Sequence, residues 1–157
     1  PTNNVEFIYT DGACTNNGKH NAKAGFGIYF KQNDTRNTSI PITNGNQTNN
    51  YAELMAINYI FNLLDKKYLV NRNIVIVSDS KYAIRCCTDY GKLVFNKNKK
   101  NVPNNSLILM TYKLVIQYPN ISFIHILAHT SNKDIHSIGN YHADKLANKA
   151  ISLNWFS

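Results

Sequence analysis

The sequence predicts a single α/β domain, a mixed five-stranded sheet with helices covering its faces. Two observations predict this class. Short β-branched runs and amphipathic stretches follow one another along all 157 residues, and no internal repeat or linker-like change of composition divides them. The hydrophobic content of 43% suffices for one buried core and argues against wholesale disorder. We therefore expect residues 1–157 to form one domain.

Five runs are typical of strands. VEFIYT (5–10) ends at an Asp-Gly turn signal, and GFGIYFK (25–31) follows a polar loop. Residues 38–43 predict a third, antiparallel strand. NIVIVS (73–78) is almost continuously apolar, as expected of a central strand covered on both faces. ISFIHIL (121–127) is the fifth predicted strand.

Between the third and fourth strands, the spacing of the apolar residues changes to that of an amphipathic helix. Further helices are predicted from Ser80, from about Asn104 to Tyr118, and around 143–151. The predicted order is therefore β-β-β-α-β-α-(α)-β-α. The helix before the fourth strand has one apolar face, made of Ala52, Met55, Ala56, Tyr59, Ile60, Leu63 and Leu64.

Charge and cysteine content narrow the function classes. The net charge is +8, from 17 Lys+Arg and 9 Asp+Glu. Such a charge favours binding to a polyanion, and the alternative is that it only keeps the protein soluble. No apolar run approaches the roughly 20 residues of a membrane span, and the start PTNNVEF does not resemble a signal peptide. Three cysteines, an odd number, favour a reducing compartment. We expect an intracellular protein, in cytoplasm or nucleus, with no membrane partner.

Four of the nine acidic residues occupy positions that can converge on one point. Asp11 and Asp79 each end a predicted strand, so parallel pairing of those strands puts both at one sheet edge. Glu53 and Asp144 are each expected in the first turn of a helix. Each acid alone has a simpler explanation: a turn for Asp11, a capping box of Asn50 with Glu53, and a helix N-terminus for Asp144.

Four carboxylates together indicate metal chemistry. Clustered carboxylates repel one another and need cations to neutralise them. Hard oxygen ligands select Mg²⁺ or Mn²⁺ over Zn²⁺. In a basic protein, such a cluster suits two-metal phosphodiester hydrolysis, in which the ions clamp the attacking and leaving oxygens. We expect two Mg²⁺ ions in the site, with Mn²⁺ able to substitute.

Four segments resemble, in order, the signature segments of the type 1 ribonuclease H family: YTDGACTNNG, TNNYAELMAI, VSDSKYA and IGNYHADKLANKA. The match extends from about Val5 to Ile151. The resemblance implies a ribonuclease H-like fold, a five-stranded mixed sheet flanked by helices, and endonucleolytic cleavage of the RNA strand of an RNA–DNA hybrid. It also implies that the catalytic, metal-binding carboxylates are Asp11, Glu53, Asp79 and Asp144.

The resemblance extends to substrate contacts. Asn17 stands six residues after the first aspartate, where the family has a substrate-contacting asparagine. Thr48, Asn49 and Asn50 resemble the loop that contacts ribose and holds phosphate. Asn104 resembles the asparagine that helps to hold a phosphate of the DNA strand. Amides and hydroxyls can recognise the RNA 2′-OH without reading base sequence.

The family also has a mobile histidine before its last helix. His129 follows the fifth strand as the family residue does, and we expect it to assist proton transfer or product departure. Asp144 lies fifteen residues later, a longer spacing than usual in the family, so the loop looks extended and His136 is a competitor. His142 is interpreted as a surface residue. Zinc binding by these histidines is disfavoured because their spacings match no common motif.

A basic segment, 92–105, departs from the family pattern. Bacterial and animal relatives hold the hybrid with a tryptophan-rich basic helix and loop, whereas this segment is shorter and has no tryptophan. We expect Lys97, Lys99 and Lys100 to bind phosphates; a solvated loop is the alternative. Tyr82, Tyr90 and Phe95 could make aromatic contacts with the hybrid or could pack in the core.

The leading hypothesis is a stand-alone, monomeric, metal-dependent ribonuclease H whose partner is an RNA–DNA hybrid. One alternative is a ribonuclease H domain derived from a reverse transcriptase polyprotein. Another is a catalytically inactive hybrid-binding module. The complete set of four acids argues against the module, because a binder gains nothing from negative charge that faces phosphates.

Overall fold

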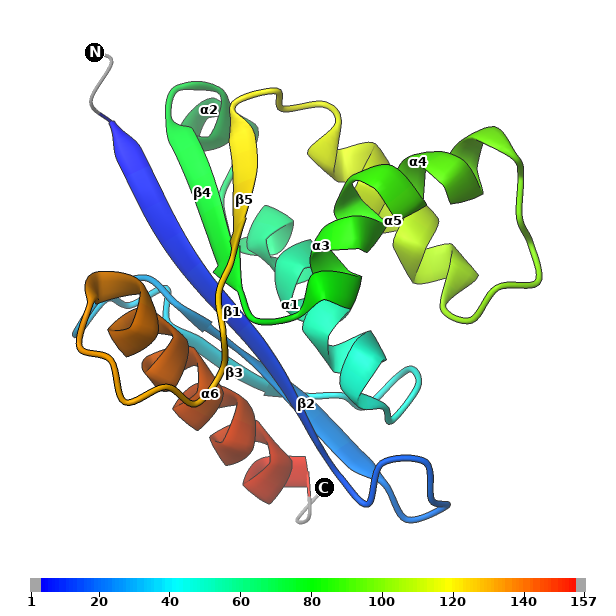
Figure 1. Ribbon diagram of the computed structural model, residues 1–157, viewed down its shortest axis with the longest axis horizontal. Coiled ribbons are helices and arrows are strands. Elements are labelled where there is room, and N and C mark those ends of the chain that lie inside the picture. The colour runs from blue at the N-terminus through cyan, green and yellow to red at the C-terminus, as the bar shows by residue number, and fades with distance from the viewer. Residues whose placement is uncertain (1–3, 155–157) are drawn as a thin grey trace.

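The computed structural model describes residues 4–154, which form a five-stranded sheet with helices on both faces (Figure 1). The sheet order is β3-β2-β1-β4-β5. β2 pairs antiparallel with β1 and β3, whereas β4 pairs parallel with β1 and β5. The predicted mixed sheet is confirmed. Its strands are β1 (Val5–Thr15), β2 (Lys23–Tyr29), β3 (Thr38–Pro41), β4 (Asn73–Ser78) and β5 (Ile121–His125).

Two of the helices in the described residues differ from the expected order. A short helix precedes β4, where Asp65 accepts a hydrogen bond from the backbone N–H of Tyr68. Another covers the start of the basic segment, which is loop only from Lys97 to Asn104. The helices are α1 (Asn49–Leu63), α2 (Lys66–Val70), α3 (Lys81–Cys87), α4 (Asp89–Asn96), α5 (Asn105–Val115) and α6 (Ile135–Asn154).

The two faces of the sheet bury different clusters. Alternate residues of β1 point to opposite faces, so Ile8 joins the large core beneath α1, α3 and α5, while Tyr9 joins a smaller cluster. That smaller cluster also contains Val77 and Ala143 and lies beneath α6, which follows the other face of the sheet (Figure 1). The catalytic candidates thus come from elements on both faces.

Strand β1 is longer than predicted, and Asp11 lies inside it rather than at its end. Asp11 pairs with Gly27 of β2, and the strand continues to Thr15. Gly12 is not a turn residue: a Cβ there would lie 2.4 Å from the backbone nitrogen of Glu53. The glycine therefore permits close approach of α1 to the sheet. Glycine inside a strand often marks such a close approach of another backbone.

The parallel pairing of β1 with β4 still brings the two aspartates together. Thr10 pairs with Ser78, so Asp11, the next residue of β1, lies beside Asp79, the residue that directly follows β4. Among the described residues, we find no helix with the length and apolar character needed to cross a bilayer.

Candidate metal centre and nucleic-acid interface

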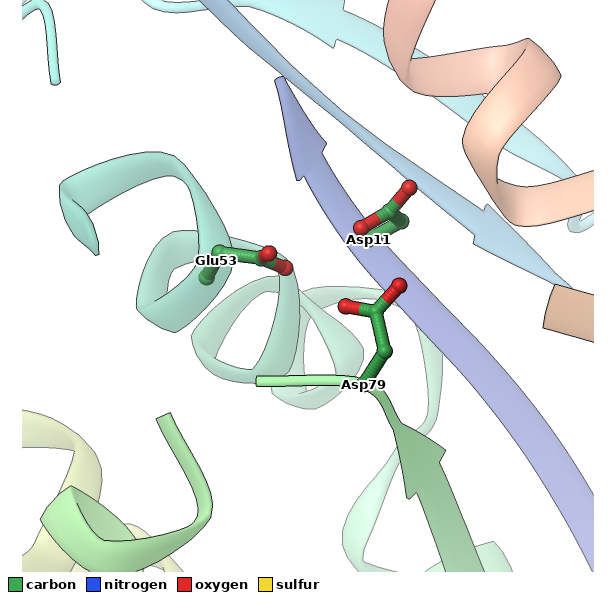
Figure 2. Close-up of side chains that lie close together, drawn as sticks. All are labelled: Asp11, Glu53 and Asp79. Atoms are coloured by element: carbon green, nitrogen blue, oxygen red, sulfur yellow. The ribbon is translucent and has the colours of Figure 1, made fainter. Parts of the chain in front are cut away.

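Three carboxylates from three separate elements meet at one point. Asp11 projects from β1, Glu53 from α1, and Asp79 directly follows β4. One ligand oxygen from each lies within 4.8 Å of the others, and Figure 2 shows the side chains pointing toward one another. Asp11 and Glu53 are buried, with 4% and 6% of their surface exposed. The structure therefore brings together three of the four acids selected from the sequence.

Glu53 is held by the strand that it faces. Its Oε1 accepts a 2.7 Å hydrogen bond from the backbone N–H of Gly12. The helix N-cap is Thr48, whose Oγ1 accepts from the N–H of Tyr51, so Glu53 lies beyond the first turn. The predicted position in the first turn is therefore wrong, and the alternative explanation of Glu53 by a capping box with Asn50 does not hold. Glu53 points toward the sheet because α1 lies close to β1 here and the buried backbone N–H of Gly12 is within hydrogen-bond reach.

Asp79 is fixed by neighbours from β5 and α6. Its Oδ2 accepts a 3.2 Å hydrogen bond from Nδ2 of Asn140, which is buried. Its backbone oxygen lies 3.2 Å from Nε2 of His125. Sequence reasoning missed both partners. Asn140 precedes Asp144 by four residues, one helical turn, and that spacing is the signal that could have found it.

Asp144 lies deeper in its helix than predicted. It is the tenth residue of α6, not part of the first turn, so a helix N-terminal role does not explain it. Its carboxylate is not part of the group within 4.8 Å. It nevertheless lies close enough to Asp11 to raise the pKa of that carboxyl by hydrogen bonding and by charge. The fully buried Ala143 and Ala147 let α6 approach the sheet closely here.

Burial and mutual repulsion oppose full ionisation of the cluster when no cation is bound. Burial is the largest cause that raises the pKa of Asp11, and the charges of Glu53 and Asp79 raise it further. Burial and then Asp79 also raise the pKa of Glu53, opposed by the hydrogen bond from Gly12. A divalent cation removes this repulsion. A set made only of carboxylate oxygens fits Mg²⁺ or Mn²⁺.

The histidines occupy different environments. His129 is exposed in the loop between β5 and α6, with a backbone φ of 55°. His136 is half-buried on α6, with Nδ1 3.0 Å from the Tyr9 hydroxyl, so much of the expected loop extension is helix. His142 is not a free surface residue, because its ring stacks on Tyr29 with centroids 4.5 Å apart. Among the described residues that follow β5, His129 alone is an exposed histidine in a loop.

The predicted amide and hydroxyl residues share one hollow. Asn17 Oδ1 accepts a 3.1 Å hydrogen bond from the N–H of Asn49, which ties the β1–β2 loop to the start of α1. Asn46, which sequence reasoning missed, donates a 2.9 Å bond to Oδ1 of Asn104. The hollow has a volume of about 360 Å³ and is lined by Asn17, Gly18, Asn46, Thr48, Asn49, Asn50, Pro103 and Asn104.

Comparison with known proteins assigns the chain. A family model described as RNase H matches residues 3–152. The chain belongs to the ribonuclease H family. A ribonuclease H of Orientia tsutsugamushi is 34% identical over 152 residues, which cover 93% of this chain and 82% of that protein. A ribonuclease H of Schizosaccharomyces pombe is also 34% identical over 152 residues, which cover 94% of this chain but only 53% of that protein.

A solved structure shares the fold. It is the foamy viral protease–reverse transcriptase in complex with RNA/DNA hybrid, with a TM-score of 0.70 and 23% identity over 94% of this chain and 20% of that chain. Ribonucleases H are metal-dependent endoribonucleases. The acidic cluster of this member is a group that could bind a metal.

Several basic residues of this ribonuclease H family member lie on α3 and around α4. Lys97, Lys99 and Lys100 are exposed in the loop between α4 and α5, which extends away from the sheet (Figure 1). Phe95 precedes this loop and is 44% exposed. A separate hollow of about 480 Å³ combines two cations with two aromatic rings, those of Lys81, Arg85, Tyr82 and Tyr90. Cations and flat rings together suit a nucleic-acid strand.

Proposed function

We propose that this chain is a metal-dependent endonuclease that hydrolyses the RNA strand of RNA–DNA hybrids. The observation that carries the proposal is the convergence of Asp11, Glu53 and Asp79 within 4.8 Å in a chain of net charge +8. Buried acids that face phosphates are unfavourable unless cations occupy the space between them. Membership of the ribonuclease H family supports the same chemistry.

The four carboxylates would hold two Mg²⁺ ions, with Mn²⁺ able to substitute. When bound, such a pair supplies a clamp on the attacking and leaving oxygens of a phosphodiester. Burial is the largest cause that raises the pKa of Asp11, and Glu53, Asp79 and Asp144 each raise it further. The N–H of Gly12 keeps Glu53 oriented toward Asp11. The amide of Asn140 donates to Oδ2 of Asp79, and Oδ1 makes no hydrogen bond with this amide.

His129 is the proposed proton carrier. It is exposed in a loop next to the strand end that precedes Asp79, so the side chain can approach a bound phosphodiester without being a metal ligand. The ring would hold or release a proton at the leaving oxygen. His136 is less suited because its Nδ1 is already engaged by Tyr9.

The substrate contacts divide between recognition and affinity. The amides and the hydroxyl of the 360 Å³ hollow suit ribose and phosphate oxygens, and these groups are Asn17, Thr48, Asn49, Asn50 and Asn104. Exposed Lys97, Lys99 and Lys100 would add sequence-independent phosphate attraction. The RNA/DNA hybrid bound to the foamy viral protein, which shares this fold, supports a hybrid as the partner.

The deciding experiment is cleavage of matched RNA–DNA, RNA–RNA and DNA–DNA duplexes with and without Mg²⁺. We expect cleavage of the RNA strand in the hybrid alone, and only with the metal. Hybrid binding without cleavage would instead favour an inactive binding module. Origin from a reverse transcriptase polyprotein would leave the chemistry unchanged and is decided by the neighbouring coding sequence. The single domain 1–157, the monomeric state and the intracellular location stay predictions.

A further inference from the structure

The last nine residues before Asp144 in the segment that follows β5 form the beginning of α6. The helix starts at Ile135, so more than two turns precede Asp144. We call Ile135–Asn140 the α6 extension. His136 and Gly139 of this segment lie against Phe7 and Tyr9 of β1. A loop of this length could adopt many conformations, whereas a helix turns its residues toward the sheet in a fixed order.

Two contacts dock the α6 extension onto β1. The hydroxyl of Tyr9 lies 3.0 Å from Nδ1 of His136, and the ring of His136 meets Phe7 edge-on, with centroids 4.8 Å apart. The Tyr9 hydroxyl can donate to Nδ1 or accept from it, according to the tautomer of the His136 ring. Gly139 packs closely against the Tyr9 ring, where a Cβ would come within 2.4 Å of a ring carbon. The helix therefore has almost no freedom to move toward the strand.

The next residue of the helix reaches the metal centre. Asn140 follows Gly139, is 5% exposed, and donates from Nδ2 to Oδ2 of Asp79 over 3.2 Å. A neutral amide orients the carboxylate without cancelling its charge, so the attraction of Asp79 for a cation is kept. The half-buried carboxylate of Asp79 would be free to rotate toward another partner without this donor.

We propose that the α6 extension is a positioning device for the metal centre: Tyr9 and His136 dock it, and Asn140 thereby orients Asp79 for cation binding. His136 and Asn140 are positioning residues, not catalytic ones. The proposal rests on the proposed function to the extent that Asp79 binds a cation. Partners that orient metal ligands typically contribute about 10–100-fold to metal affinity or activity.

The test measures Mg²⁺ binding directly. Metal-free protein is melted at increasing MgCl₂ concentrations, and the rise of the melting temperature gives an apparent dissociation constant. We expect Asn140→Ala to raise that constant at least about tenfold. Tyr9→Phe and His136→Leu each remove one partner of the docking bond, and we expect a rise of about two- to fivefold.

Rescue and control variants separate positioning from general destabilisation. His136→Asn places an acceptor close to the position of Nδ1 and should restore the wild-type Mg²⁺ constant. His142→Phe changes another half-buried ring of α6 while keeping its stacking on Tyr29, and should leave the constant unchanged. At saturating Mg²⁺, kcat of Tyr9→Phe and His136→Leu should return to within about twofold of wild type, because only the affinity for the cation is affected.

The outcomes decide between this inference and the proposed function. An unchanged Mg²⁺ constant in Asn140→Ala overturns the inference, and so does an unchanged constant in both Tyr9→Phe and His136→Leu. If the wild type binds Mg²⁺ but cleaves no hybrid, the proposed function fails. The Mg²⁺ dissociation constants of the variants then still test the inference. If Asn140→Ala does not fold, Tyr9→Phe, which keeps the ring and its packing, decides alone.

Discussion

Gly12 donates its backbone N–H to Oε1 of Glu53 across 2.7 Å, at the point where α1 lies directly against β1. The contact orients one acid of the metal centre and explains why position 12 has no side chain. Gly12→Ala would push a methyl group into the backbone of α1. We expect the free energy of unfolding to fall by about 1–3 kcal/mol, the usual cost of overpacking. Urea unfolding measures this, and a wild-type midpoint would show that the helix can move aside.

The central acids should be essential for cleavage but not for binding. Asp11→Asn or Asp79→Asn removes a ligand charge and should abolish Mg²⁺-dependent cleavage, while hybrid affinity survives or increases because repulsion of phosphates is relieved. Asp89→Asn is the matched control, since that side chain is 70% exposed outside the cluster. Substantial cleavage by either cluster variant with Mg²⁺ would refute the proposed metal role.

The metal-free protein should become less stable as pH rises. Burial raises the pKa of Asp11 above its ordinary value of 3.8, so the folded state holds a proton that the unfolded state releases. Stability from this group is therefore complete below pH 3.8 and is lost progressively above it. In EDTA at pH 7, Asp11→Asn should exceed wild type by at least about 1 kcal/mol, the equivalent of one pKa unit. Chemical unfolding at pH 4 and pH 7 should show the gap only at the higher pH.

Lys97, Lys99 and Lys100 should contribute to affinity through phosphates. Replacing all three by alanine should weaken hybrid binding and flatten the slope of log K against log[salt] by up to about 2.7 units, about 0.9 for each phosphate that the protein no longer neutralises. A control that removes the same charge replaces the exposed Lys31, Lys66 and Lys67. Equal slopes for the two triple variants would mean that the loop does not contact phosphates and is only a solvated loop.

The two candidate histidines should separate kinetically. His129→Ala should lower kcat by a factor within or somewhat below the roughly 10²–10⁴ typical of acid–base assistance, the magnitude expected for removal of a proton carrier, without altering Mg²⁺ affinity. His136→Ala should instead weaken Mg²⁺ binding and approach wild-type kcat at saturating Mg²⁺. Single-variant kinetics under saturating hybrid measure both. The reverse pattern would mean that His136 carries the proton.

Much of the fold was predictable because its signals are local. The continuous apolar run at 73–78 identified β4, and the apolar face from Ala52 to Leu64 identified α1, with boundaries within a few residues. Ser80 marked the start of α3 correctly, as its N-cap. The convergence of Asp11, Glu53 and Asp79 followed from strand order and from the signature segments. These inferences needed only short-range pattern and the parallel pairing of two strands.

The sequence by itself was enough to predict most element types, the family and the three acids that the structure brings together, since periodicity and motifs are local features of the chain. Only the tertiary structure decided which neighbours orient those acids. Asn140 meets Asp79 across 61 positions, and His136 meets Tyr9 across 127. Gly12 reads locally as a turn, yet the approach of α1 makes it the interior of β1. Such contacts depend on how packed elements meet in space, and no local pattern encodes that geometry.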